Sequence, residues 1–149
     1  MFRGIHALNL DAKGRLSIPS RYRQQIEAMC EGRLILTIDT KDRCLLLYPL
    51  PDWEEIERKL DRLSGLNPQV RRVQRMLIGH ATECEMDKQG RILVASLLQS
   101  FAGIEKQVVL VGQGKKFECW DAPTWNKARD EWFEESETEL SPELEMLSL

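Results

Sequence analysis

Two five-residue stretches of one pattern contain the side chains best suited to chemistry in this chain of 149 residues. The first runs from Asp11 to Arg15 and the second from Asp87 to Arg91, which is 87 − 11 = 76 positions later. Both follow the pattern Asp-x-x-Gly-Arg. The arginine has a planar fork of N–H donors that suits a phosphate or the edge of a guanine base. The repetition indicates that the chain contains two copies of one unit.

Each of these stretches predicts a tight turn between two strands. The residues before it alternate in polarity, and a short apolar run follows it. Asp suits the first position of a type I turn, because its carboxylate accepts backbone N–H groups, and Gly14 and Gly90 suit the position that needs a positive φ. We therefore expect hairpins over residues 5–18 and 81–94, each with its arginine at the start of the return strand.

The order of the elements repeats after each turn, which predicts an α+β fold of two β-β-α-β-β units. The first hairpin is followed by an apolar-periodic helix and two strands, over residues 21–29, 34–38 and 44–48. The second is followed by the same elements over residues 96–102, 108–111 and 116–120. A unit of roughly 50 residues alone buries too little surface to be robust, so we expect the two copies to pack on each other.

The helical segments outside the two units complete the predicted organisation. We divide the chain into a first unit, a helical linker, a second unit, and a C-terminal helix with an acidic tail, over residues 5–52, 53–79, 81–124 and 125–149. The apolar stripes of the helices over 53–63 and 68–78 have no assigned partner within one unit. They are therefore candidate contacts between subunits.

Arg71, Arg72 and Arg75 lie off the apolar stripe of the second linker helix. Two interpretations remain open for them. They form either a second nucleic-acid surface, with the helix pair resembling a helix-turn-helix, or a solvated basic face that makes ion pairs between subunits. We prefer the second interpretation.

Charge is unevenly distributed along the chain. The net charge is −3, but residues 130–149 contain eight acids and no Lys or Arg, which leaves residues 1–129 at 21 − 16 = +5. The body is therefore basic and the tail acidic, so a polyanionic partner is compatible with the body.

Several classes of protein are disfavoured. The four cysteines occur singly, without a Cys-x-x-Cys pair, so we expect buried free thiols and no metal site. No Gly-rich phosphate loop or nucleophile elbow is present, so we expect no enzyme, no cofactor and no small-molecule substrate. No run of ~18 to 20 apolar residues and no signal peptide is evident, which predicts a cytoplasmic protein that does not enter a membrane.

The two Asp-x-x-Gly-Arg turns, each followed by a strand, a helix and two strands, resemble the SpoVT-AbrB family of swapped-hairpin DNA-binding domains. The segment from Tyr48 to Trp53 between the units, and the run from Arg71 to Arg75 that leads to Gly79, are similar to members that hold two such units in one chain. The resemblance covers about residues 1–135. It implies that the two hairpins interlock into an intrachain pseudo-two-fold barrel, with additional linker and C-terminal helices.

The resemblance also implies which residues contact DNA. The expected contacts are the basic residues at the turns, Lys13, Arg15, Lys88 and Arg91. Asp11, Gly14, Asp87 and Gly90 are expected to support the turns, since a carboxylate beside a phosphate is repelled and suits the orientation of an arginine instead. The second copy departs from the pattern, because Gln89 and Ala95 stand where the first copy has Lys13 and Pro19.

The function implied by the resemblance is sequence-specific regulation of transcription. Such a protein would be a nucleoid-associated, ring-shaped homo-oligomer that binds direct repeats in promoter DNA and represses its own operon of division and cell-wall genes. The alternative is a ring-forming assembly protein that binds division or envelope-synthesis proteins without specific DNA readout. A steep loss of DNA affinity with salt would favour the first.

Overall fold

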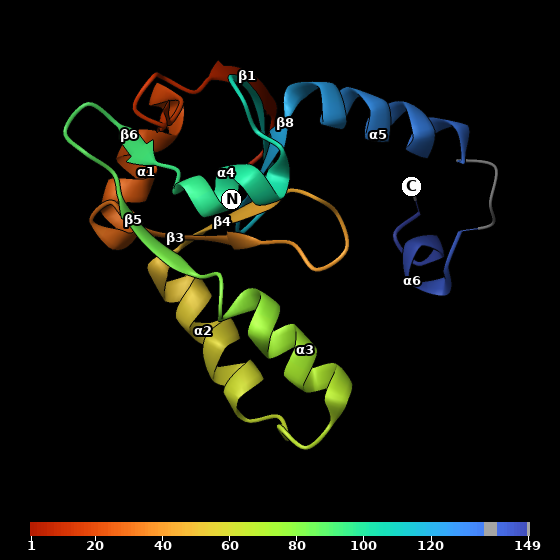
Figure 1. The fold of residues 1–149 in the computed structure, drawn as a ribbon. Helices are drawn as coiled ribbons and strands as arrows, with labels where there is room; N and C mark the ends of the chain where they lie inside the picture. The colour runs from red at the N-terminus through yellow and green to blue at the C-terminus, as the bar shows by residue number, and fades with distance from the viewer. Residues whose placement is uncertain (136–139, 149) are drawn as a thin grey trace.

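The computed structural model describes residues 1–135 and 140–148, and residues 136–139 and 149 of the predicted acidic tail lie outside the described part. The fold contains sheet and helix, which confirms the α+β prediction (Figure 1). The strands are β1 (Ile5–Asn9), β2 (Arg15–Ser17), β3 (Arg33–Ile38), β4 (Leu45–Pro49), β5 (Thr82–Glu85), β6 (Arg91–Leu93), β7 (Gln107–Gly112) and β8 (Phe117–Asp121). The helices are α1 (Ser20–Cys30), α2 (Leu50–Asp61), α3 (Pro68–Leu77), α4 (Ser96–Ala102), α5 (Ala122–Glu134) and α6 (Pro142–Glu145).

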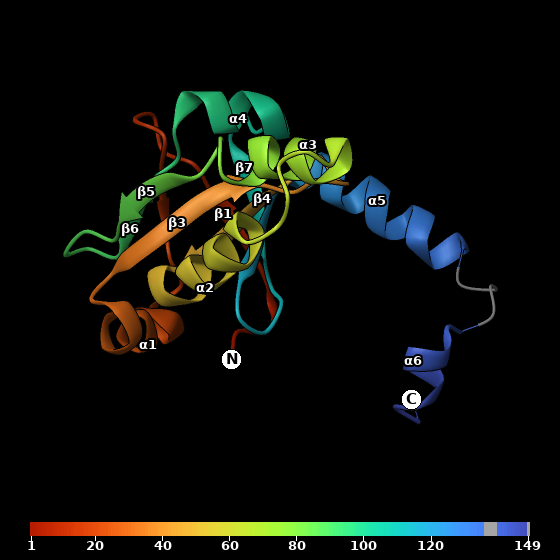
Figure 2. The ribbon, with the colours of Figure 1, turned by 90° about the horizontal axis from the view of Figure 1, so that it is seen from below.

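The main sheet joins strands of both units. Its six antiparallel strands follow the order β1-β7-β8-β4-β3-β5, so β1 of the first unit pairs with β7 of the second, and β5 of the second pairs with β3 of the first. Figure 2 shows β5 running alongside β3. The equivalent strands of the two units are β1 and β5, β3 and β7, and β4 and β8. Replacing each strand by its equivalent gives the same order, read from the opposite edge of the sheet. The sheet therefore has a pseudo-two-fold relation centred between β4 and β8.

The two strands beside each Asp-x-x-Gly-Arg turn do not pair with each other along their length, which corrects the expectation of hairpins over residues 5–18 and 81–94. The first turn is closed locally, since the Asp11 N–H donates to the Arg15 carbonyl at 2.9 Å. Beyond the turn, the two strands have different partners. β1 pairs with β7 in the main sheet, while β2 pairs with β6 in a separate two-stranded ribbon. The physical reason is burial. The β2–β6 pairing places Leu16 opposite Ile92, and both side chains are essentially inaccessible to water.

One large hydrophobic core lies between the two units. It takes Leu16, Ile18 and Ile26 from the first unit and Ile92 and Leu110 from the second, among others. Both units contribute to the same packed cluster, so the two copies stabilise each other, as the small size of one unit predicts.

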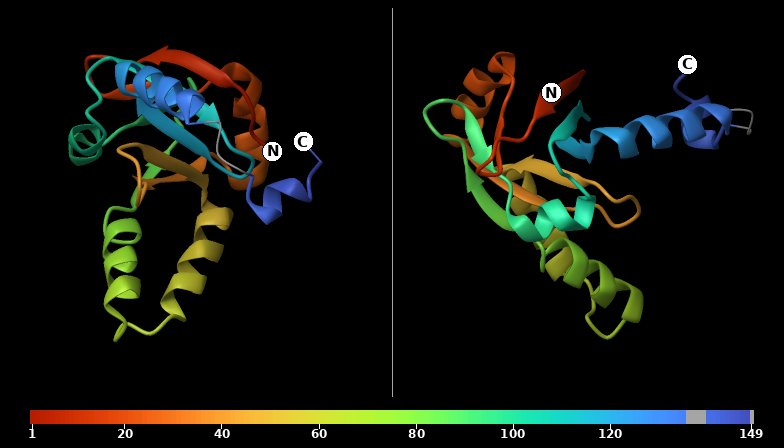
Figure 3. Two further views of the ribbon diagram at one scale, coloured as in Figure 1. Left: turned by 90° about the vertical axis from the view of Figure 1, so that its right-hand side faces the viewer. Right: turned by 45° about the horizontal axis from the view of Figure 1, so that its top comes forward.

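Helices α2 and α3 form an antiparallel pair that projects from the body of the molecule (Figure 3). Its base is anchored on the sheet, where Trp53 is buried against Tyr48 with ring centroids 5.7 Å apart. The completely buried Thr37 of β3 donates its hydroxyl to the Leu77 carbonyl at the end of α3, at 2.7 Å. Because this end of α3 is docked on the sheet, a single side-chain hydroxyl helps to hold the projecting pair in place.

Among the helices of the described residues, none has the length and apolar character that crossing a membrane requires.

Replacement of Thr37 by Val should lower the free energy of unfolding by about 1 to 3 kcal/mol, because the Leu77 carbonyl loses its donor in a buried place. The change removes the hydroxyl and keeps the shape, so it tests the hydrogen bond rather than the packing. Urea unfolding measures the effect. The exposed Thr40 provides the matched control, and an equal effect of Thr40→Val would contradict the assignment.

Candidate nucleic-acid interface

The first turn is built around the carboxylate of Asp11. Its Oδ1 accepts the backbone N–H groups of Lys13 and Arg15 at 2.9 and 2.8 Å, and its Oδ2 accepts the Arg15 Nε–H at 2.8 Å. The hydrogen bond from the Arg15 backbone, the largest cause, holds the pKa of Asp11 below its ordinary value. Gly14 has a φ of 78°, a conformation that side-chain-bearing residues rarely adopt. The turn therefore keeps a charged carboxylate against its arginine.

The second turn repeats this geometry. Asp87 accepts the backbone N–H groups of Gln89 and Arg91, both at 2.9 Å, and the Arg91 Nε–H at 3.0 Å. The backbone hydrogen bond from Arg91 is again the largest cause that lowers the pKa of the aspartate, and Gly90 has a φ of 79°. The two turns are thus equivalent in backbone and in ion pairing.

Each turn is held by residues of the other unit. At the second turn, the Gly90 carbonyl accepts the Ile18 N–H at 2.8 Å, and Arg23 of α1 donates its Nε–H to the Ile18 carbonyl at 2.8 Å. A Cβ on Gly90 would overlap with the far end of the Arg23 side chain, which would have to move, so the positive φ is the stronger reason for glycine here. The second turn is therefore positioned by the first unit.

The first turn shows the reciprocal arrangement. The Gly14 carbonyl accepts the Val94 N–H at 2.8 Å, and Gln99 of α4 donates its side-chain N–H to the Val94 carbonyl at 2.7 Å. Sequence analysis missed Arg23 and Gln99. Their spacing of 99 − 23 = 76, which is the spacing of the two turns, is the signal that could have identified them.

The β2–β6 ribbon brings the two arginines to one face. Its register pairs Arg15 with Leu93, Leu16 with Ile92, and Ser17 with Arg91. Side chains alternate along a strand, so the buried pair in the middle places Arg15 and Arg91 together on the outer face. Residues at such diagonal positions lie about 7 to 8 Å apart. Two turns that are distant in sequence therefore form one composite cationic face.

The donors of these arginines are only partly used. Each Nε–H is bonded to its own aspartate, and the side chains of Arg15 and Arg91 are 30% and 28% exposed. Within residues 1–135 and 140–148, neither guanidinium has a second acidic partner. The terminal N–H groups therefore remain available to an external acceptor, and the exposed Lys13 and Lys88 lie in the adjacent turns.

The surroundings of the two turns differ in charge. The hollow beside the first turn includes Glu105 and Lys106, which oppose each other in sign. The hollow beside the second turn includes Glu27, Glu31 and Glu85. The second turn is therefore the more acidic of the two, a difference that depends on α1 and β5 as much as on the turn itself.

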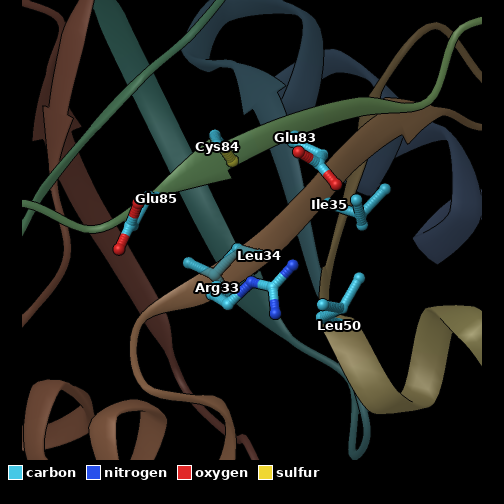
Figure 4. A pocket seen from close by; sticks show the side chains of 7 residues that line it. All are labelled: Arg33, Leu34, Ile35, Leu50, Glu83, Cys84 and Glu85. Atoms are coloured by element: carbon cyan, nitrogen blue, oxygen red, sulfur yellow. The ribbon is translucent and has the colours of Figure 1, made fainter.

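A small hollow between β3, β5 and the start of α2 is a poor candidate for catalysis (Figure 4). Arg33 lies opposite Glu85 in the strand register, an ordinary cross-strand charge pair. The thiol of Cys84 lines the hollow, but burial raises its pKa to about 12, so it stays protonated and unreactive. In the described part of the chain, no group of three or more His, Cys, Asp or Glu side chains is placed to hold a metal ion.

Comparison with known proteins identifies the family. The model of the family described as "MraZ protein, putative antitoxin-like" matches residues 1–76 and again residues 77–144. Three similar proteins, each named "Transcriptional regulator MraZ", come from Thioalkalivibrio sulfidiphilus, Methylococcus capsulatus and Coxiella burnetii. They are 57%, 53% and 52% identical to this chain, over 100%, 99% and 100% of both chains.

These matches agree with the residues that carried the resemblance. The doubled Asp-x-x-Gly-Arg turn, together with the segment from Tyr48 to Trp53, is similar to MraZ proteins in particular, and the family model finds the same two copies. The relatives' names describe regulators and not enzymes, which is consistent with the prediction of a non-enzyme. The chain therefore belongs to the MraZ family.

Proposed function

We propose that this protein is a transcriptional regulator that binds double-stranded DNA sequence-specifically through the outer face of the β2–β6 ribbon. The observation that carries the proposal is the placement of Arg15 and Arg91 on that face, each held by its own aspartate with terminal donors available. The name of the relatives supports the regulatory role.

The proposed contacts follow from the chemistry of the side chains. Arg15 and Arg91 bind guanine edges or phosphates through their planar forks, while Lys13 and Lys88 supply point charges to phosphates. The aspartates and glycines of the turns, Asp11, Gly14, Asp87 and Gly90, position the arginines and do not touch DNA. Because each arginine is oriented before DNA arrives, less side-chain freedom is lost on binding.

We further propose that the exchange of strands is the swapped-hairpin arrangement of tandem SpoVT-AbrB domains, closed into an intrachain pseudo-two-fold barrel. The pairings of β1 with β7, β5 with β3 and β2 with β6 support it. In this division the domains cover residues 5–52 and 81–124. Residues 53–79 link them, and residues 125–149 form the C-terminal helix and tail.

A ring-shaped homo-oligomer would explain how a small face achieves selectivity. A mismatched base pair costs only about 1 to 3 kcal/mol at one site, but linked sites gain ~10² to 10⁴ in avidity when several DNA repeats are engaged together. We propose that the oligomer binds direct repeats in the promoter of its own division and cell-wall operon and represses it, in the cytoplasm and associated with the nucleoid.

Replacement of Arg15 by Ala should abolish specific binding to the promoter upstream of the protein's own gene. Loss of one bidentate contact corresponds to about tenfold to a hundredfold in affinity per site, and the loss multiplies in an oligomer. A salt-titrated DNA-binding assay measures it, with oligomer size checked in parallel and the exposed Arg62→Ala as the matched control. Wild-type affinity in an intact Arg15→Ala oligomer would overturn the proposal in favour of the assembly-protein alternative.

Replacement of Arg91 by Ala should weaken the same binding less than replacement of Arg15. The acidic residues beside the second turn, Glu27, Glu31 and Glu85, already reduce the attraction of that turn for phosphates. The comparison requires the same DNA and the same salt for both variants. A larger effect of Arg91→Ala would show that the second turn dominates.

The lowered pKa values of Asp11 and Asp87 predict how the turns respond to acid. Because each carboxyl has a pKa below the ordinary value of 3.8 for Asp, its contribution to turn stability is present above that pH and is lost as the pH falls through the lowered pKa. NMR of the Arg15 and Arg91 Nε–H signals should give midpoints below 3.8. Asp11→Asn should abolish the Arg15 transition and weaken DNA binding at neutral pH, and an unchanged titration would refute the pairing.

A further inference from the structure

The outer face of the β2–β6 ribbon includes an exposed apolar side chain, that of Leu93. In the strand register Leu93 lies opposite Arg15, and it is 58% exposed. Because 93 − 17 = 76, the equivalent residue of the first unit is Ser17, which lies opposite Arg91. The two halves of the face therefore share an arginine but differ in the residue opposite it.

The Leu93 side chain lies against the first turn. A Cβ placed on Gly14 would lie 3.8 Å from the Cδ1 of Leu93, which is an ordinary contact distance. Directly opposite residues of an antiparallel pair have Cβ atoms about 4.5 to 5.5 Å apart, so Leu93 also lies beside Arg15. The two side chains are therefore presented together to a ligand of this face.

A second exposed leucine lies near the same turn. Leu97 is 68% exposed at the start of α4, and its neighbours Ser96 and Gln99 line the hollow that also borders residues 9–14. The equivalent position of the first unit, 97 − 76 = 21, is occupied by the exposed Arg21. The half of the face at the first turn therefore combines cations with apolar side chains, whereas the other half has polar residues at the equivalent positions.

Packing within the protein does not account for these leucines. Among the described residues, the clusters that form the hydrophobic core do not include Leu93 or Leu97. The serine at position 17 shows that the ribbon does not need an apolar residue at this place in order to fold. A lone exposed leucine is ordinary on a protein surface, but here two lie beside Arg15 of the proposed DNA face. Their place on that face indicates a role in binding.

We propose that Leu93 contacts the C5-methyl group of a thymine in the major groove, beside the base or phosphate that Arg15 binds. The major groove admits a two-stranded β-ribbon, and the thymine methyl is the apolar group that base pairs present there. A leucine shields that methyl from water, whereas it offers no hydrogen bond to a phosphate. Leu93 is thus a specificity-determining residue, and Leu97 extends the apolar surface. This inference rests on the proposed function and adds a base preference to it.

The position of Leu93 on one half of the face gives the complex a direction. The register of the ribbon is the same when its two strands are exchanged, so Arg15 and Arg91 alone would fit a site equally well in both orientations. A methyl contact on one side distinguishes these orientations. A symmetric face matches a palindrome, whereas direct repeats need an asymmetric one, so the leucine suits the proposed binding to direct repeats.

The size and the charge of the surface argue against a protein as its occupant. A stable protein interface buries about 800 Å² on each partner and has an apolar centre that is depleted of charged residues. Two leucines beside Arg15 and Lys13 do not form such a centre. A single methyl group flanked by phosphates matches both the small apolar area and the neighbouring cations.

Replacement of thymine by deoxyuridine tests the contact, because it removes the methyl group and keeps the base pairing. Each thymine in a DNA fragment with one binding site, taken from upstream of the protein's own gene, is replaced in turn. Fluorescence anisotropy at fixed salt then measures the affinity of the full chain. At one thymine the affinity should fall about fourfold, which corresponds to one buried methyl group. Thymines outside the site provide the internal control.

Leu93→Ser should abolish this dependence, so that DNA with thymine and DNA with deoxyuridine are bound equally. The variant should fold, because serine occupies the equivalent position of the ribbon. Leu93→Met keeps an apolar side chain of similar reach and should keep the dependence. The matched control is Leu66→Ser, at an exposed leucine between α2 and α3, which should leave the ratio of the two affinities at its wild-type value.

The ratio of the two affinities separates base readout from a structural role, because a general loss of binding lowers both affinities alike. Promoter-specific binding by the wild type that depends on no thymine methyl would overturn the inference. Dependence retained in Leu93→Ser, or lost in Leu93→Met or Leu66→Ser, would also overturn it. In each of these cases the proposed function stands. If the wild type binds promoter and unrelated DNA equally, the proposed function and this inference both fail.

Discussion

The pairing of β2 with β6 is the constraint on which the rest of this structure depends. Each strand has only three residues, so few backbone hydrogen bonds join them. The pairing is stabilised mainly by burial of side chains, since Leu16 and Ile92 meet in the core and are almost inaccessible to water. This pairing joins the two units. It also decides which way the arginines point, because a shift of one residue would turn Arg15 and Arg91 into the core. The same strand register therefore packs the core and orients the two arginines of the site.

The turns add a second level of order to the same ribbon. In both copies one carboxylate accepts two backbone N–H groups and one guanidinium N–H, so it shapes the turn and aims the arginine together. The backbone carbonyls of Gly14 and Gly90 are then bonded to the opposite unit. A partly exposed ion pair contributes little to stability, but it limits the positions of a long side chain. The aspartates therefore serve the geometry of the site more than the strength of the fold.

The arginine face and the projecting helices occupy different parts of the molecular surface. The composite arginine face lies on the ribbon, whereas the α2–α3 pair and α5 project from other parts of the body. The projecting helices carry opposite charges, since α3 has exposed arginines and no acidic residue, whereas the far end of α5 has exposed acidic residues.

The sequence by itself determined the number of units, the order and nature of their elements, and the two turns, because these follow from local spacing: the Asp-x-x-Gly-Arg pattern, the helical periodicity after Pro19 and Asn67, and the repeat of 76 positions. It also led to the MraZ family, which the doubled match supports.

The sequence misjudged the pairing of the strands beside each turn, because strands of three to five residues do not encode their partner, and it missed the roles of Arg23 and Gln99. Only the tertiary structure decided that β1 and β5 cross to the other unit and that Arg15 and Arg91 share one face. The physical reason is that short strands gain their stability from the burial of Leu16 against Ile92 across the two units, and such long-range burial is not written in the local pattern.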